Sequence, residues 1–307
     1  MIPLSPFAPE PARGRQIWGL AAPLLALLFV AAPLVPAMLL LKHLGLLDAT
    51  DNPAGMAGLA TFLLLPFALI GLLVLAWIGF VEKRPPATIG LTRPGGPRRY
   101  LGGLAIGCAM TAAIVAAIWA AGGADAGGFA PAFATPAALL NIAILLACFA
   151  VQASVEEILF RGWLFSAVAR KLNVPIAVVL TASVFALLHY GPGQPLLFTF
   201  NIVLFSIFAC LWALRAGSIW GVMGWHTGWN WLLATGFELR VTGLDAHQPA
   251  LLVRMVADGP FWLTGGGEGP EGSLFCTLAF VAGILLLASR AAPRRRVVSM
   301  PAQPAGQ

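Results

Sequence analysis

Charged side chains are scarce in this chain: Asp, Glu, Lys and Arg together make up only 10% of its 307 residues. Soluble globular domains carry roughly 25% charged residues, so this composition excludes that class. Hydrophobic residues reach 59% and the mean hydropathy is +0.88, which together predict a polytopic membrane protein. Basic residues are in excess, but they form no stripe interleaved with aromatic residues, so we expect no nucleic-acid partner.

Several enzyme motifs are also absent. The chain has no His-Glu-x-x-His, and it has neither the Gly-x-Ser-Gly nor the Gly-x-Gly-Asp pattern of other intramembrane proteases. A glycine-rich run at 265–269 lacks the Gly-Lys-Ser/Thr ending of a phosphate-binding loop. The four cysteines fall within apolar stretches, so we expect buried thiols and neither disulfides nor a metal cluster. These cysteines are Cys108, Cys148, Cys210 and Cys276.

Apolar residues gather in eight stretches. A helix needs about 20 apolar residues to cross a bilayer, and most of these stretches reach that length. The sequence therefore predicts an all-α, polytopic membrane protein with about eight transmembrane helices, of which the fifth is the shortest. The expected spans are Ile17–Leu41, Ala57–Val81, Leu101–Ala121, Ala137–Leu159, Pro175–Tyr190, Leu196–Leu214, Ser218–Phe237 and Ser273–Ser289.

Lysine and arginine are distributed unevenly between the predicted loops. With a cytoplasmic N-terminus, 14 of them lie in inside segments and three in outside loops, while Arg161 lies within a helix. Cytoplasmic loops carry such an excess, so both termini are predicted to be cytoplasmic. The Ala-, Gly- and Pro-rich composition favours a bacterial source, and thus an integral, multi-pass protein of the bacterial plasma membrane.

One membrane domain without internal repeats is expected. Residues 1–16 form its cytoplasmic N-terminal segment, residues 17–290 form the transmembrane helical domain, and residues 291–307 form a disordered basic tail. The outside loop 238–272 is long for a connection in a helical bundle, and it is expected to be a flexible loop.

Two adjacent glutamates, Glu156 and Glu157, lie in the fourth apolar stretch. A carboxylate at mid-bilayer costs roughly 2.5–3.5 kcal/mol, so keeping both indicates chemistry, ion transfer or a buried polar network. Glu157 and Arg161 are four residues apart and share a helix face, so they are expected to pair. Glu156 is rotated by about 100° from its neighbour. It faces away from Arg161 and has no cation on its own face of the helix, which suits a general acid or base.

A histidine follows in the next stretch, within the pattern Phe185-x-x-x-His189. The turn between the two stretches falls near Asn173, with Glu156 17 residues before it and His189 16 residues after it. In an antiparallel helical hairpin, residues equidistant from the turn lie at similar depth, so the carboxylate and the imidazole are expected to be close. The alternative is a histidine that only forms hydrogen bonds within the helix packing.

The seventh stretch contributes His226 and Asn230, which are four residues apart and share a helix face. Together they could hold a substrate carbonyl, while interhelical hydrogen bonding is the alternative. Glu156, His189 and His226 also make a zinc-like ligand set if a zinc ion is bound. The residues alone leave metal-dependent and metal-free hydrolysis both open.

In this order, the motifs resemble the CPBP family of intramembrane proteases, which includes the CAAX prenyl endopeptidases of the Rce1 type and the bacterial Abi proteins. The resemblance covers residues 137–237. It implies an eight-span helical fold with a catalytic cavity inside the membrane that is open toward the cytoplasm. It also implies roles: Glu156 and His189 activate the attacking water, His226 and Asn230 assist at the oxyanion, and Glu157, Arg161 and Phe185 support the site.

The expected function is an intramembrane endopeptidase that cleaves a membrane-associated peptide or protein, with or without a lipid modification. Two other functions remain open. One is a catalytically silent relative that acts as a membrane scaffold or bacteriocin-immunity protein. The other is a proton-coupled transporter that uses the carboxylates as a relay, although the sequence shows none of the repeats common in transporters. The natural substrate and the oligomeric state are not readable from the residues.

Overall fold

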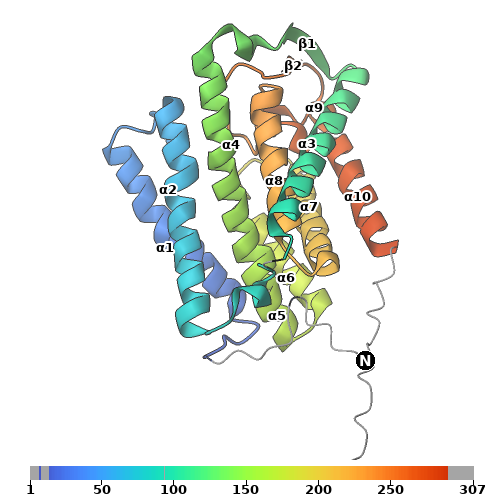
Figure 1. The fold of residues 1–307 in the computed structure, drawn as a ribbon. Helices are drawn as coiled ribbons and strands as arrows, with labels where there is room; N and C mark the ends of the chain where they lie inside the picture. Colours follow the sequence, from blue (N-terminus) through green and yellow to red (C-terminus); the bar gives the residue numbers. More distant parts are fainter. Residues whose placement is uncertain (1–6, 8–13, 93, 290–307) are drawn as a thin grey trace, which may run out of the picture.

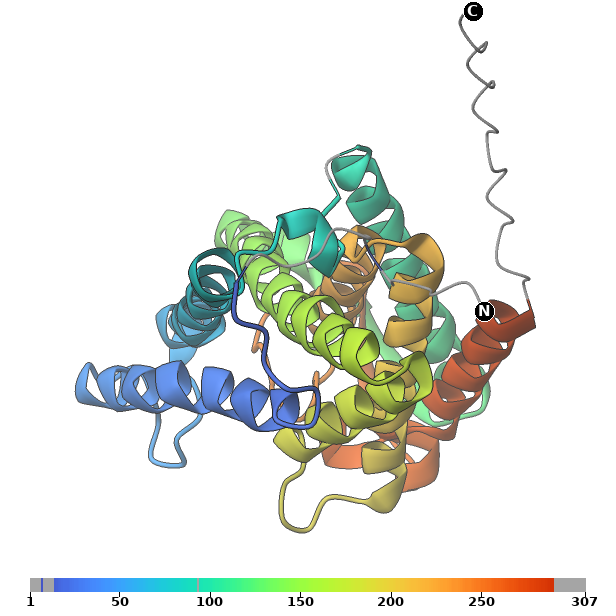
Figure 2. The same cartoon turned by 90° about the horizontal axis from the view of Figure 1, so that it is seen from below.

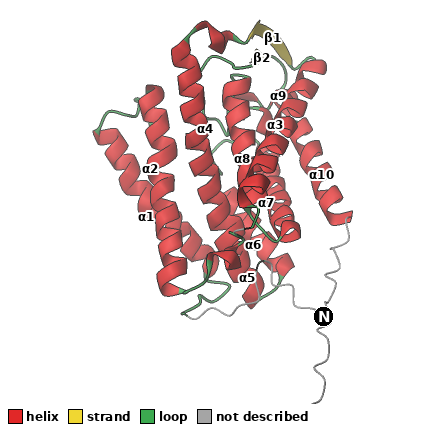
Figure 3. Cartoon of the chain, in the orientation of Figure 1, coloured by secondary structure: helices red, strands yellow, loops and turns green. Residues whose placement is uncertain are grey.

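A computed structural model describes residue 7 and residues 14–92 and 94–289. Helices make up most of this part of the chain, and they run roughly alongside one another (Figure 1, Figure 3). The tail 291–307 and most of the segment 1–16 lie outside the described residues, so the predictions for them stay predictions. The α-helices are α1 (Ala22–His43), α2 (Gly55–Ala76), α3 (Gly96–Ala120), α4 (Pro136–Glu157), α5 (Phe165–Lys171), α6 (Val174–Leu188), α7 (Leu196–Ala216), α8 (Trp220–Trp231), α9 (Phe261–Thr264) and α10 (Leu274–Ser289).

Three of these α-helices, α2, α4 and α8, are continued by π-helical segments. The connections between helices contain 3-10 turns. The π-helical segments are Trp77–Val81, Ile158–Leu164 and Leu232–Gly236, and the 3-10 turns are Pro86–Ile89, Pro131–Ala134, Gly266–Glu268 and Pro270–Gly272. The pieces around α4 join into one long rod from Pro136 to Lys171, which carries the two glutamates.

Five helices in the described part of the chain are long and apolar enough to cross a membrane. They are Ala22–His43, Gly55–Val81, Gly96–Ala120, Pro136–Lys171 and Leu196–Ala216. The apolar helices α6 and α10 are shorter, and α8 reaches Gly236 only through its π-helical end. The chain is thus a mostly helical, polytopic membrane protein, whereas the count of eight spans stays a prediction.

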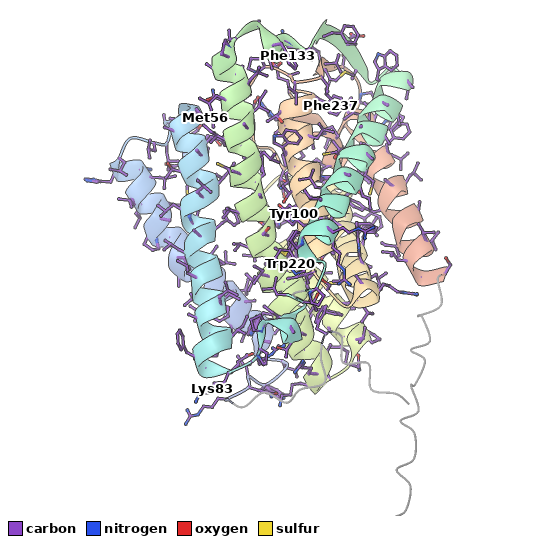
Figure 4. The ribbon with its side chains drawn as sticks, in the orientation of Figure 1. Met56, Lys83, Tyr100, Phe133, Trp220 and Phe237 are labelled. Carbon is purple, nitrogen blue, oxygen red and sulfur yellow. The ribbon has the colours of Figure 1, made fainter. Side chains whose placement is uncertain are left out.

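The two ends of the bundle differ in content. At one end, strands β1 (Ala124–Phe129) and β2 (Val253–Ala257) pair in an antiparallel sheet, shown at the top of Figure 3. We call this the sheet end, and it includes loops 44–54, 121–135, 189–195 and 237–273. We call the opposite end of the bundle the basic end. It contains the connections 77–95, 172–173 and 217–219 together with residues 14–21. Figure 4 shows Lys83 at the basic end and Phe133 near the sheet end.

The sheet end corrects two predictions. The sequence predicts only helices, yet β1 and β2 pair, because these short segments leave backbone groups that the helices cannot satisfy. The segment 238–272 was expected to be a flexible loop, but it folds back onto the bundle. Leu251 N donates to Thr235 O at 2.7 Å, and Leu252 N donates to Gly236 O at 3.0 Å.

Helices α3 and α8 approach each other with little space between their backbones. A Cβ atom added to Gly103 would collide with the carbonyl oxygen of Gly221, and one added to Gly224 would collide with that of Tyr100. Small residues permit such close approach in membrane helices, where packing rather than hydrophobicity drives association. This seam fixes the position of α8 in the bundle. On the opposite side, α1 and α2 lie together at the edge of the molecule (Figure 2).

Candidate active site

The two glutamates lie at the end of α4, directly before the π-helical segment Ile158–Leu164. Both residues are buried, with 8% of Glu156 and none of Glu157 exposed. π-Helical turns are rare and are frequently found at functional sites. The burial of two acidic residues in one turn requires partners, because an unpaired buried charge is costly.

Glu157 has two partners of different kinds. Arg161 Nη1 donates to Glu157 Oε1 at 3.0 Å, which confirms the pairing predicted from the four-residue spacing. His226 Nδ1 lies 2.9 Å from the same oxygen, across the interface between α4 and α8. Because an ionised carboxylate only accepts hydrogen bonds, this contact assigns the proton to Nδ1. Glu157 therefore orients the imidazole of His226.

Glu156 is held by a different group. Gln152 Nε2 donates to Glu156 Oε1 at 2.8 Å, and Asn230 Nδ2 donates to Gln152 Oε1 at 3.0 Å. The other carboxylate oxygen, Glu156 Oε2, is buried and has no hydrogen-bond partner among the described residues. This oxygen lies 3.8 Å from His226 Nε2. The separation is too long for a direct hydrogen bond, so both atoms are available to a third group.

His226 and Asn230 thus share one face of α8, as predicted, and that face meets the two glutamates. His226 contacts the acidic pair directly, while Asn230 reaches it through Gln152. Asn230 uses one N–H in this contact, which leaves a second N–H and a carbonyl oxygen for other partners. The arrangement suits a site that holds a polar group of a ligand.

His189 lies at the C-cap of α6, one residue beyond the end of that helix. Its Nδ1 is 2.8 Å from Phe185 O, and its ring packs against that of Phe185 with centroids 4.2 Å apart. Within the described part of the chain, no hydrogen bond or ion pair links His189 to either glutamate. These contacts do not include the close approach to Glu156 that the spacing predicts, so that approach stays a prediction.

Phe185 explains how the supporting residues fit together. The guanidinium carbon of Arg161 lies 4.3 Å from the centroid of the Phe185 ring, within the range of a cation–π interaction. The same ring stacks with Phe205 and packs edge-on against Phe160. Phe185 therefore separates Arg161 from His189 and holds both, which agrees with the supporting role implied by the resemblance.

A cavity of about 450 Å³ leads to this group from the sheet end. Gln152, His189 and Asn230 line its polar part, and the segments 51–53 and 241–244 line its mouth. Glu156 and His226 lie directly behind this lining. The apolar wall comes from α2 and α4 and consists of Phe62, Leu63, Phe67 and Phe149. His189 thus joins the site as part of the cavity wall.

The position of the mouth brings two predictions into conflict. The charge bias places the basic end in the cytoplasm, whereas the resemblance implies a cavity that is open toward the cytoplasm. The cavity runs to the sheet end instead, between loops at 51–53 and 241–244. The two predictions therefore cannot both hold for this chain.

The expected zinc ligands can be tested against the geometry. Glu156 Oε2 and His226 Nε2 are 3.8 Å apart, and His189 contacts Phe185 O through Nδ1, so Nε2 is the nitrogen of His189 that could reach a metal. No group of three His, Cys, Asp or Glu side chains with the arrangement of a metal site occurs in ranges 14–92 and 94–289. These residues do not gather as a zinc site requires, so the mechanism below contains no step through a metal.

Two functional residues are missing from the sequence predictions. Gln152 bridges Glu156 and Asn230, and its position four residues before Glu156 in an apolar helix is a signal that could have found it. Glu271 accepts from Trp229 Nε1 at 2.9 Å and from Thr242 Oγ1 at 2.9 Å. It therefore ties α8 to the cavity mouth, a link that no spacing in the sequence indicates.

Comparison with known families agrees with the site. The family model of the type II CAAX prenyl endopeptidase Rce1-like proteins matches residues 136–232. This stretch begins with α4 and ends just after α8, so it contains all of the predicted site residues. Residues 136–232 form an Rce1-like domain, which confirms the resemblance to the CPBP family. Searches among curated proteins and among solved structures gave no match.

The match supports a class for the protein. The family is that of CAAX-type peptidases, and the apolar helices support an integral membrane protein. A peptidase of this class acts on substrates in or at the membrane.

Proposed function

We propose that this chain is an intramembrane endopeptidase in which Glu156 is the general base. The observation that carries the proposal is a buried carboxylate oxygen, Glu156 Oε2, that has no hydrogen-bond partner among the described residues. The same carboxylate accepts from Gln152, which lines the cavity. The position of this oxygen 3.8 Å from His226 Nε2 leaves room for a water that contacts both atoms.

The residues divide the reaction between them. Glu156 Oε2 takes a proton from the water, and the resulting hydroxide attacks the peptide carbonyl carbon. The C–N bond then breaks as the same proton passes from Glu156 to the leaving amine. Asn230 donates its free N–H toward the developing oxyanion, and His189 lines the same cavity. The water must reach a buried site, and the polar lining of the cavity provides that path.

The two glutamates have different roles in this proposal: Glu157 positions His226, and Glu156 takes part in the chemistry. Glu157 is held by Arg161 and directs His226, so its charge is already compensated. Glu156 receives one hydrogen bond, from Gln152, and keeps one oxygen free. We infer that the cellular site of this reaction is the bacterial plasma membrane, and that the substrate is a membrane-associated polypeptide.

Replacement of the proposed base tests the function. We expect Glu156→Gln to lower the cleavage rate of a fluorogenic membrane-proximal peptide by roughly 10²–10⁴-fold, because general acid–base catalysis contributes about that much. The amide keeps the shape and the hydrogen bond from Gln152 to Oε1, so the purified variant should elute and unfold as the wild type does. Glu238→Gln, in the outer loop, is the matched control and should retain full activity.

The same variants separate the competing functions. A Glu156→Gln protein that cleaves at the wild-type rate would falsify the assignment of the base. A wild-type protein without cleavage, but with carboxylate-dependent proton flux in liposomes, would favour the transporter. If the wild type cleaves nothing and Glu156→Gln protects cells from a bacteriocin as well as the wild type does, a silent scaffold or immunity protein would be favoured.

A further inference from the structure

We infer that the cavity opens on the side of the membrane opposite the cytoplasm, so that this chain cleaves polypeptides that approach from the extracytoplasmic side. This inference rests on the proposed function and adds the side of approach and the class of substrate. It departs from the cytoplasmic opening that the family resemblance implies.

The mouth of the cavity belongs to the sheet end. Segments 51–53 and 241–244 line it, and the loop 189–195 contacts the same region through Gln194 Nε2, which lies 3.4 Å from Glu268 Oε2. From there the cavity descends along α2 and α4 to Gln152 and the polar residues beside the glutamates. Figure 4 shows Phe237, which precedes the mouth segment, in the upper half of the molecule, far from Lys83.

The site is closed toward the basic end by packed side chains. Every residue in the range 158–168 is buried. Below them, Trp163 Nε1 donates to Glu82 Oε1 at 3.0 Å, and Arg84 Nη2 donates to Ser166 Oγ at 2.7 Å. A cavity at this end, beside Glu82 and Arg84, measures about 10 Å³, which holds one water at most. A polypeptide therefore reaches Glu156 from the sheet end and not through this seal.

Charge decides which end faces the cytoplasm. Among the described residues, the basic end and the helix turns that adjoin it carry eight Lys and Arg against one acidic residue, Glu82, whereas the loops of the sheet end carry two against eight. The longest loop of the sheet end, 237–273, is short enough for the positive-inside rule to apply to its charges. Because Lys and Arg are retained on the cytoplasmic side, the basic end is cytoplasmic and the mouth is extracytoplasmic.

The lining of the cavity indicates the kind of polypeptide. The apolar wall, which includes Phe62 and Phe67, suits apolar side chains next to the scissile bond. Asp51 at the mouth is itself paired with Lys42 at 2.7 Å, but the sheet end as a whole has an acidic excess, which attracts basic residues that flank this apolar stretch. The substrate class is therefore an apolar segment with a basic flank, presented at the outer surface of the bilayer.

Cysteine labelling tests the orientation without requiring activity. The experiment uses the full-length chain with the four native cysteines replaced, and adds Asn52→Cys at the mouth or Lys83→Cys at the basic end. Both positions are exposed. A membrane-impermeant maleimide applied to intact cells is expected to label Asn52→Cys fully and Lys83→Cys only after permeabilisation. The opposite labelling pattern would overturn the inference.

Sidedness of cleavage is the second measurement. Sealed right-side-out vesicles are expected to cleave an externally added apolar peptide with a lysine flank, and sealed inside-out vesicles only after detergent is added. Glu156→Gln vesicles give the background. Cleavage by sealed inside-out vesicles at the right-side-out rate would contradict the inference. If detergent-solubilised wild type cleaves nothing, the proposed function fails, while the labelling pattern still decides the orientation.

Discussion

The two faces of α8 show two ways of joining membrane helices. One face presents Gly224 and Gly228, whose absent side chains let the backbone of α3 approach closely. The other presents His226 and Asn230, which form side-chain hydrogen bonds with residues of α4. The contact between α3 and α8 is rigid because backbone atoms cannot move aside. The contact between α4 and α8 is adjustable because side chains can change their conformation. The comparison teaches that a catalytic face is held in place by the packing of the face behind it.

The largest effect is expected from filling the glycine seam. Gly103→Leu places a side chain where even a Cβ atom would collide with Gly221 O, so α3 and α8 must separate. We expect destabilisation above the roughly 1–3 kcal/mol typical of overpacked cores, with loss of monodisperse protein and all cleavage. Gly102→Leu is the matched control, because Gly102 faces open space, and it should purify and unfold like the wild type. If Gly103→Leu purified and unfolded like Gly102→Leu, the contact between α3 and α8 would not be the rigid one proposed here.

The next largest effect is expected from a substitution on the polar face of α8, which carries His226 and Asn230. His226→Gln removes the imidazole beside Glu156 Oε2 while leaving the glycine seam intact, so we expect kcat to fall by roughly 10²-fold or more. KM and the unfolding temperature should change little. His247→Gln, whose side chain is 77% exposed in an outer loop, serves as the control and should show wild-type kinetics. Parallel losses of stability and kcat in His226→Gln would mean that this face is structural.

A smaller effect is expected from replacing Gln152, whose side chain links Glu156 of α4 to Asn230 of α8. Gln152→Met keeps the volume of the side chain but removes the hydrogen bonds to Glu156 and Asn230. A hydrogen bond to a charged group contributes about 1.5–3 kcal/mol, so we expect kcat to fall at least tenfold. Steady-state kinetics with Gln152→Asn as a partial rescue would separate this positioning role from simple packing. An unaltered kcat would show that the bridge does not orient the base.

The smallest effect is expected from metal removal. Among the described residues, the three proposed zinc ligands do not form a group with the arrangement of a metal site. We therefore expect a chelator to leave the cleavage rate of purified protein unchanged, with elemental analysis of the same sample as the check. Loss of activity that returns when zinc is added back would show that His189 moves into the site.

Local spacing was enough to predict much of the site. The ion pair of Glu157 with Arg161 and the shared face of His226 and Asn230 follow from the four-residue repeat of a helix. Asn201, a polar residue in the apolar helix α7, also has the partner that its type requires, since its Nδ2 donates to Glu271 O at 2.8 Å. In each case the partners lie on one helix, or the residue type alone requires a partner in the membrane.

Relations between distant segments could not be predicted in the same way. Counting from the turn places His189 at the depth of Glu156, but it does not reveal that α6 ends at Leu188 and leaves the imidazole at a cap. The strands at the sheet end pair residues about 130 positions apart, such as Ala124 with Ala257. The direction in which the cavity opens likewise depends on how loops meet, and helical periodicity contains no information about it.

The glycine seam also has a consequence for biosynthesis. Cys108 on α3 and Gly228 on α8 are in contact although 120 residues separate them in the chain. During synthesis α4 and its glutamates enter the bilayer well before α8 emerges, so Glu157 has Arg161 but not yet His226. Only when α8 docks against α3 does the imidazole reach the carboxylates. Under the proposed function, the nascent chain therefore has an incomplete site until α8 has been inserted.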